Sequence, residues 1–173
     1  MAEKPSAAEE TAHTDSNHEP STNSSQMRLL VPKRDANGEV VAFHANLRAN
    51  TCFQPQEIIV FDIVVTNTMT AYDPLDGIFT APVTGTYVFI WNFGSFGRSY
   101  NILELVVHGT GIGSSISDSE NNMSDTHPAA GFVVVHVDAG QRVFVRKTAQ
   151  GSNCYLRSDY INMKTTFSGW LLG

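Results

Sequence analysis

The sequence is poor in cysteine and has no long run of apolar residues. Only two cysteines occur among the 173 residues, Cys52 and Cys154, and their spacing fits neither a metal site nor a redox motif. They are free to form a disulfide in an oxidising compartment or to stay reduced, and the sequence leaves both open. No apolar segment is long enough to span a membrane, and no signal peptide is visible at the start of this chain.

Branched aliphatic and aromatic residues are missing from the first 26 positions. These residues include no Leu, Ile, Val, Phe, Tyr or Trp, so they bury too little apolar surface to offset the entropy of ordering. Five acids against the single Lys4 give this segment −4 of the chain's formal net charge of −6. We expect residues 1–27 to form a disordered acidic tail and residues 40–173 to form one globular domain.

A basic stripe is absent too, which argues against a nucleic-acid partner. No pair of the six histidines has the spacing of zinc ligands, so no metal site is predicted. Neither the serines nor the glycines of 109–115 precede a helix, as a nucleophile elbow or a phosphate loop would require. We therefore expect a protein that is not an enzyme.

A helical period of apolar residues is also missing. From residue 40 onward, short apolar runs alternate with Gly, Asn, Asp, Pro and Ser, which is typical of an all-β domain. Asp138–Gln141 predicts a hairpin turn, because Gly140 tolerates positive φ. The Gly- and Ser-rich segment 109–125 is expected to be an exposed loop. The expected strands are 40–47, 57–67, 77–83, 86–93, 101–109, 131–137, 142–148, 153–158 and 165–172.

One of these strands, GTYVFIW, is apolar on both faces. Tyr87, Phe89 and Trp91 point to one side of a strand, and Val88 and Ile90 point to the other. One face can cover the core of its own domain. A soluble protein rarely leaves an opposite face this apolar exposed to water. We expect a neighbouring subunit to cover it, the alternative being a loop or the first strand of the same chain.

The spacing of aromatic residues around this strand is specific. It reads Phe61-x5-Asn67-x4-Tyr72-x6-Phe79-x5-Gly85-x-Tyr87-x-Phe89. This pattern resembles the signature of the globular head domain of complement C1q. Val41–Ala45 resembles that family's first strand and Thr166–Leu172 its closing strand, so the resemblance covers residues 40–173. Two features depart from the family: Trp91 stands where Phe or Tyr is usual, and no collagen-like Gly-X-Y repeat occurs.

The resemblance implies an all-β, ten-stranded jelly-roll sandwich, like that of the tumour necrosis factors, assembled as a homotrimer. Neighbouring subunits around the threefold axis would then cover the second face of GTYVFIW. The closing strand would lie within the inner sheet.

Loops at one end of such a rigid sandwich usually carry recognition. The family's strand order is expected to gather three loops at the end away from both termini. Tyr100 and Tyr160 are suited to stack on sugar rings, and Arg98 and Arg157 to pair with a carboxylate such as that of sialic acid. The alternative is that these are ordinary polar loop residues. The predicted ligand-binding residues are Arg98, Tyr100, Asp138, Gln141, Arg157, Asp159 and Tyr160.

Family members often carry calcium near the apex of the trimer. Asp138 and Asp159 are the residues whose oxygens are available for it, but two carboxylates per subunit are few for an ion that takes six to eight oxygens. No cofactor is therefore assigned, and calcium stays an open alternative.

Two functions of different classes fit these residues. The first is a soluble pattern-recognition lectin of innate immunity, resembling the collagen-free invertebrate C1q-domain lectins and binding carbohydrates on glycoproteins or microbial surfaces. The second is a secreted trimeric ligand for a protein receptor, resembling cerebellins or tumour necrosis factors. The polar loops favour glycan, and a purely structural role is a third alternative. Both main functions imply a secreted, extracellular protein, with which the sequons at Asn23 and Asn122 are compatible.

Overall fold

Two antiparallel sheets of five strands each make up the domain. The computed structural model describes residues 38, 40–119, 126–152, 154–161 and 163–172, so the predicted tail and both sequons lie outside the described residues. The first sheet has the order β3-β1-β12-β6-β9 and the second the order β4-β5-β10-β7-β8. A small third sheet pairs β11 with β2. The predicted jelly-roll sandwich of ten main strands is confirmed.

The strand bounds are as follows. The first sheet consists of β1 (Ala42–Asn46), β3 (Ile63–Asn67), β6 (Gly85–Phe96), β9 (Thr126–Val137) and β12 (Thr166–Leu171). The second consists of β4 (Tyr72–Asp73), β5 (Ile78–Thr80), β7 (Tyr100–Val107), β8 (Thr110–Asp118) and β10 (Arg142–Gly151). The small sheet consists of β2 (Thr51–Cys52) and β11 (Tyr155–Leu156), and a short 3-10 turn, η1 (Thr68–Thr70), follows β3.

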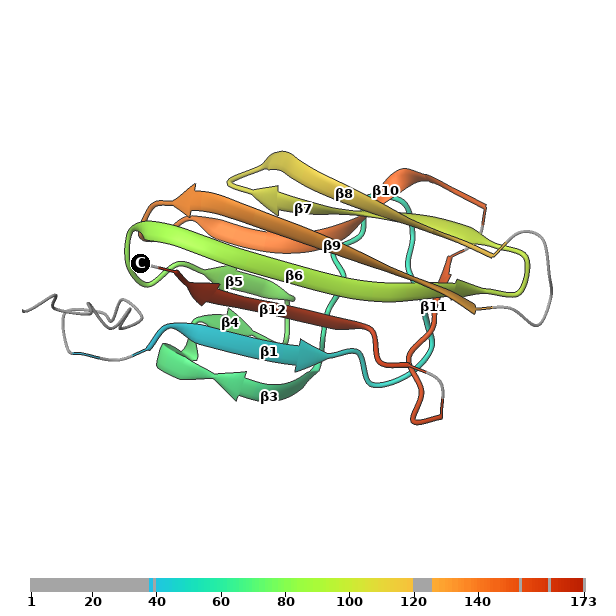
Figure 1. Ribbon diagram of the computed structural model, residues 1–173, viewed down its shortest axis with the longest axis horizontal. Helices are drawn as coiled ribbons and strands as arrows, with labels where there is room; N and C mark the ends of the chain where they lie inside the picture. Colours follow the sequence, from blue (N-terminus) through green and yellow to red (C-terminus); the bar gives the residue numbers. More distant parts are fainter. Residues whose placement is uncertain (1–37, 39, 120–125, 153, 162, 173) are drawn as a thin grey trace, which may run out of the picture. The chain divides into compact units, whose positions relative to one another are not determined.

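The sandwich has two ends that differ in what they contain. The first residues of β6 lie beside the end of β12, where Tyr87 is paired with Leu171, and we call this the terminal end. The last residue of β6, Phe96, is paired with Thr126 at the opposite end, which we call the apical end. In Figure 1 the C-terminus marks the terminal end at the left, and β11 lies toward the apical end at the right.

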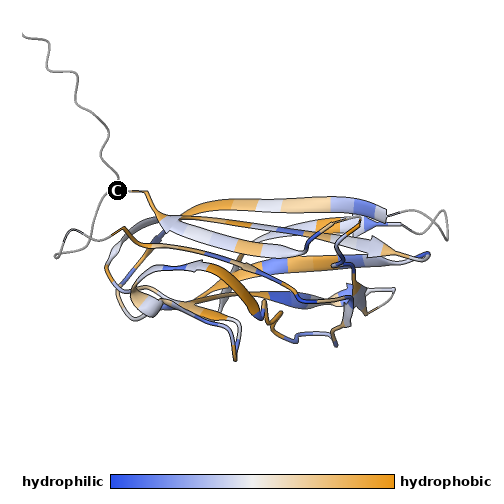
Figure 2. Cartoon of the chain, turned by 90° about the horizontal axis from the view of Figure 1, so that it is seen from below, coloured by the Kyte–Doolittle hydropathy of each residue, from blue (hydrophilic) through white to orange (hydrophobic). Residues whose placement is uncertain are grey.

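Aromatic side chains from both sheets fill the space between them. Tyr87, Phe89 and Trp91 of β6 all point inward and are buried, as the alternation of this strand predicts. The Phe43 ring stacks on Tyr72 and on Phe79, with centroids 5.0 Å apart in both pairs. Offset and edge contacts of this kind add to the stabilisation that comes from burial alone. Figure 2 shows hydrophobic segments on the strands of both layers.

The residues of the sequence signature contact one another directly. The Asn67 side chain accepts a hydrogen bond from the Tyr72 backbone N–H (3.0 Å) and donates one to the Tyr72 carbonyl (2.8 Å). The Tyr72 hydroxyl in turn lies 3.1 Å from both the N–H and the carbonyl of Phe61. Burial raises the pKa of the Tyr72 phenol, so the hydroxyl stays protonated and keeps its donor. The signature spacing is therefore a set of contacts that closes the segment 61–72.

Trp91 fits into the core because its partner on the next strand has no side chain. Trp91 is paired with Gly131 of β9, and a Cβ placed on Gly131 would lie 1.9 Å from Cζ2 of the indole. Gly113 of β8 leaves room on the other sheet, where a Cβ would lie 2.7 Å from Cγ2 of Val133. Gly131 thus accommodates the tryptophan that departs from the family pattern, and Gly113 accommodates Val133 beside it.

The structure corrects several expected boundaries. Residues 110–118 form strand β8 and not a loop; their inward positions are small (Gly113, Ser115 and Ser117), so the segment lacks the apolar alternation of an ordinary strand. β9 begins at Thr126, five residues before the expected start at 131. The expected strand 57–67 is regular only from Ile63, and its first part pairs with β10 through the single bridge between Ile58 and Arg146. Asp138–Gln141 forms a turn as expected, but the turn does not close a hairpin, because β9 and β10 belong to different sheets.

Enlarging Gly131 is expected to destabilise the domain. Gly131→Val should lower the free energy of unfolding by about 1–3 kcal/mol, because the new side chain overpacks against the indole of Trp91. The double variant Gly131→Val/Trp91→Phe should recover much of this loss, since the smaller ring leaves room. Urea unfolding of the four proteins of the cycle measures the coupling. Strictly additive effects would show that the two residues do not share one space.

Candidate functional site

The first sheet exposes an apolar face on its side away from the core. Outward positions of neighbouring strands align in rows, with Ile90 beside Phe132 in one row and Val88 beside Trp170 and Val134 in the next. Phe132 is 62% and Val134 50% exposed. Among the described residues, no loop or strand covers these two side chains. We call this surface the open face. It includes the second face of the GTYVFIW strand, although Val88 is only 3% exposed and Ile90 is half-buried within this chain.

The turn between β6 and β7 presents Arg98 at the apical end. Gly97 and Arg98 have φ angles of 71° and 58°, so both residues adopt the left-handed conformation in this tight connection between the two sheets. Glycine adopts this conformation freely, whereas an arginine there is strained. The Arg98 side chain is exposed. Tyr100 follows at the start of β7 and is half-buried, with its backbone N–H bound to the Ser152 hydroxyl (2.9 Å).

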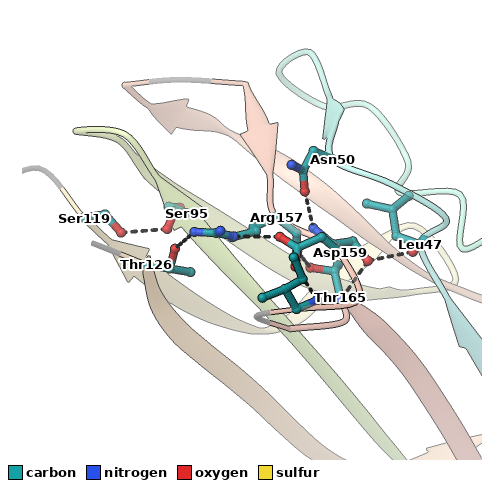
Figure 3. Close-up of polar contacts among 10 residues, drawn as sticks. Leu47, Asn50, Ser95, Ser119, Thr126, Arg157, Asp159 and Thr165 are labelled. Atoms are coloured by element: carbon teal, nitrogen blue, oxygen red, sulfur yellow. Dashed lines mark hydrogen bonds and ion pairs between the residues drawn. The ribbon is translucent and has the colours of Figure 1, made fainter. Parts of the chain in front are cut away.

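Arg157 is held by partners within the chain. Its Nε lies 2.9 Å from Oδ2 of Asp159, its Nη1 donates to the Thr126 hydroxyl, and its guanidinium lies 5.5 Å from the centroid of the Phe96 ring. Figure 3 shows Arg157 between Thr126 and Asp159, bridging β9 and the segment after β11. The guanidinium and the carboxylate that the sequence offered for ligand binding thus already neutralise each other.

Hydrogen bonds to the segment that follows β1 hold the segment that carries Arg157. The Ser158 hydroxyl donates to the Leu47 carbonyl (2.6 Å), and the Ser158 N–H donates to the Asn50 side chain (2.7 Å). The Thr165 hydroxyl donates to the Arg157 carbonyl (2.6 Å), which closes the segment on itself (Figure 3). Residues 157–161 and 163–165 therefore form a defined structure against the apical end, which we call the apical loop.

Beneath the apical end the interior is polar. Ser95 donates its N–H to the Ser117 hydroxyl (2.7 Å), and its carbonyl accepts from the Ser119 hydroxyl (2.7 Å). The Asn101 amide donates to the Ser95 hydroxyl (2.9 Å). Lys147 is also buried, and burial lowers the pKa of its ammonium group. Hydrogen bonds thus connect the apical ends of β6, β7 and β8, and no pattern in the sequence had indicated them.

The tip of the apical loop is exposed and apolar. Tyr160 is 95% and Ile161 91% exposed. The ammonium of Lys164 lies 3.9 Å from the centroid of the Tyr160 ring, which is cation–π distance. The sequence identified Tyr160 but missed Ile161 and Lys164, because only the fold of the loop brings Lys164 back to the tyrosine.

The three recognition loops do not share one end, contrary to expectation. Arg98, Tyr100, Arg157, Asp159 and Tyr160 lie at the apical end, whereas Asp138 and Gln141 lie at the terminal end. There the Ala139 N–H donates to the Thr84 hydroxyl (2.9 Å) and the Gly140 N–H to the Ala81 carbonyl (2.8 Å). The reason is topological: β9 runs from Thr126 at the apical end back to Val137, which is paired with Gly85.

This separation also bears on the calcium site for which Asp138 and Asp159 were considered. Asp138 and Asp159 lie at opposite ends of the domain, so they cannot contribute oxygens to one ion within a chain. Within the described ranges, no three His, Cys, Asp or Glu side chains are grouped as metal ligands.

A disulfide attaches the segment that leads into the apical loop to the connection between β1 and β3. Cys52 and Cys154 are bonded across a sequence separation of 102 residues. They lie on the small sheet, in which Tyr155 is paired with Cys52. The bond therefore connects the segment between β1 and β3 with the segment that leads into the apical loop.

These sheets, in this strand order, define a jelly-roll β-sandwich of the kind found in C1q and the tumour necrosis factors. The chain belongs to the C1q domain family, because the family's sequence profile matches residues 42–172. It is 29% identical over 144 residues to the mouse Complement C1q and tumor necrosis factor-related protein 9. That alignment covers 83% of this chain and 40% of the relative, so the chain spans less than half of the relative's length.

Solved structures support the same fold. The globular domain of zebrafish complement 1qA superposes with a TM-score of 0.63 at 20% identity, covering 77% of this chain and 98% of that one. The tumour necrosis factor Eiger from S. frugiperda superposes with a TM-score of 0.59 at 13% identity, covering 78% of this chain and 93% of that one. Within the described part of the chain, no helix is long and apolar enough to cross a membrane.

Removing the disulfide is expected to destabilise the domain. The double variant Cys52→Ser/Cys154→Ser should lose about 2–5 kcal/mol, because a cross-link over a long loop restricts the unfolded chain. Its Tm should fall by roughly 5–20 °C in thermal melting. The parent protein in reducing agent should approach the variant. A variant that melts together with the oxidised parent would contradict the expectation.

Proposed function

We propose that the protein is a secreted homotrimeric lectin of innate immunity, which recognises glycans, including sialylated ones, through side chains at its apical end. The function is binding and not catalysis. The observation that carries the recognition part is the presence of exposed Arg98 and Tyr160 and half-buried Lys164 at the end remote from the C-terminus. Exposed guanidinium, ammonium and aromatic groups are the ones that bind a carboxylate and the apolar face of a sugar ring.

The open face supports assembly of three copies. Phe132 and Val134 project from β9, and Ile90 on β6 and Trp170 on β12 continue the apolar surface. A second copy would remove these side chains from water. Three weak sites on one assembly bind a multivalent glycan surface with gained avidity, so shallow apical sites are sufficient. Secretion is supported by the Cys52–Cys154 disulfide, since such bonds persist in oxidising compartments.

A second candidate function is a trimeric ligand for a protein receptor. The feature that favours it is the tip of the apical loop, where Tyr160 and Ile161 stand side by side almost fully exposed. Apolar and aromatic side chains of this kind become buried anchors in protein interfaces. The relatedness to the mouse Complement C1q and tumor necrosis factor-related protein 9 is compatible with this candidate.

The trimer is expected to depend on the open face. Sedimentation equilibrium at micromolar concentration should give three times the chain mass of 18.9 kDa. Phe132→Glu should shift the protein to monomer, because a carboxylate would be buried without a partner. Leu75→Glu places the same charge on an exposed leucine of the β4–β5 connection and should leave the trimer intact. A parent protein that sediments as a monomer would exclude the assembly.

Glycan recognition is expected to depend on the exposed apical side chains. The parent should bind sialylated glycoprotein on an array, and sialidase treatment should reduce the signal. Arg98→Ala should weaken binding by about 1.5–3 kcal/mol per site through loss of a charge-assisted hydrogen bond. Tyr160→Ala tests stacking, and neither change should move the Tm, since exposed charges contribute little to folding. Repeating the array with chelator tests for calcium. A blank array would favour the protein receptor.

A further inference from the structure

A hollow of about 600 Å³ lies where the apical loop meets the first sheet. Its floor is one row of outward positions, in which Asn92 of β6 is paired with Thr166 of β12 and with Ala130 of β9. Its walls are Pro128 on one side and Met163 and Lys164 of the apical loop on the other. The hollow lies at the apical border of the open face, and we call it the apical notch. Its volume is within the range of small-molecule sites.

A glycine determines how the loop lies over the sheet. The Met163 sulfur rests directly on Gly94 of β6, where a Cβ would lie 2.3 Å from it. The Arg157 N–H donates to the Gly94 carbonyl (2.8 Å), and the Asp159 N–H donates to the Met163 carbonyl (2.8 Å). The loop is therefore attached at Gly94 and turns away before Asn92. The notch is the space between this attachment and the floor, so it exists before any ligand arrives.

The notch combines a cation, an amide and apolar surface. Lys164 lines the notch, its ammonium lies 3.9 Å from the centroid of the Tyr160 ring, and it forms no ion pair with any other described residue. Oδ1 of Asn92 accepts the Thr166 N–H (3.1 Å), so its amide NH₂ group remains as a donor on the floor. Pro128, Ala130 and Met163 supply the apolar wall. This set fits a polar ring with one negative charge and one apolar side.

We propose that the apical notch is the subsite for a sugar that carries a carboxylate, a proposal that rests on the lectin function above. The Lys164 ammonium pairs with the carboxylate, the Asn92 amide donates to a ring substituent, and Met163 and Pro128 contact the apolar side of the sugar. Tyr160 forms the rim. Lys164 is therefore a ligand-binding residue, whereas Arg157 positions the loop through Asp159 and Thr126.

Direct binding to the intact trimer tests this assignment. Isothermal titration with N-acetylneuraminic acid should give binding to the parent that falls about tenfold or more in Lys164→Gln, the effect of losing one charge-assisted hydrogen bond. Lys164→Arg should retain most of the affinity. The methyl ester of the sugar, which lacks the charge, should bind parent and Lys164→Gln equally weakly. Arg142→Gln, at the terminal end, is the matched control and should bind like the parent.

Chemical labelling gives a second readout. Acetylation of the assembled protein, followed by mass spectrometry, should modify Lys164, and N-acetylneuraminic acid should protect it. Lys164 that resists acetylation without sugar would mean that a neighbouring subunit fills the notch, which would overturn the proposal. Unchanged affinity in Lys164→Gln, with glycan binding intact on the array, would overturn the subsite and leave the lectin function standing. Absence of any glycan binding would overturn both.

Discussion

The contacts among Phe61, Asn67 and Tyr72 are the constraint on which the rest of the fold depends. Between β3 and β4 the chain must leave one sheet and enter the other, and η1 includes backbone with positive φ at Met69 and Thr70. The Asn67 amide satisfies both backbone groups of Tyr72, and the buried phenol returns to Phe61. An unsatisfied buried polar group costs about 1–3 kcal/mol, so loss of the Asn67 amide or of the Tyr72 hydroxyl would destabilise this crossing. The aromatic core can then pack on both sides of the connection between β3 and β4.

Small residues decide where large ones can lie. Gly131 makes space for Trp91 of β6 in the core, and Gly94 makes space for Met163 on the outer side of β6. Two features of β6 therefore depend on glycines. Gly131 allows the tryptophan that departs from the family pattern, and Gly94 allows the apical loop to lie close to the sheet. The loop's approach leaves the apical notch beside it, so packing and the candidate binding surface have the same origin.

The fold could be predicted from the sequence because the signature residues contact one another. Their spacing along the chain therefore reflects contacts in the folded domain. The sequence was insufficient for β8, whose inward Gly and Ser residues carry no apolar alternation, and for the pairing of Cys52 with Cys154, which are distant in sequence. Arg98 and Tyr160 are exposed at the apical end as expected. Asp138 was misplaced because the direction of β9 depends on counting every strand before it, and the missed β8 is one of them.

The positively charged side chains at the apical end differ in whether a carboxylate of the same chain already neutralises them. An external carboxylate that approached Arg157 would compete with Asp159 and the Thr126 hydroxyl, so its binding would be offset by the loss of contacts that hold the loop. Arg98 and Lys164 form no ion pair with a described residue, so an anion that binds them breaks no such pair. In the proposed trimer the threefold axis points all three apical ends the same way. Each anionic site is then repeated toward one surface, which is the geometry that avidity requires.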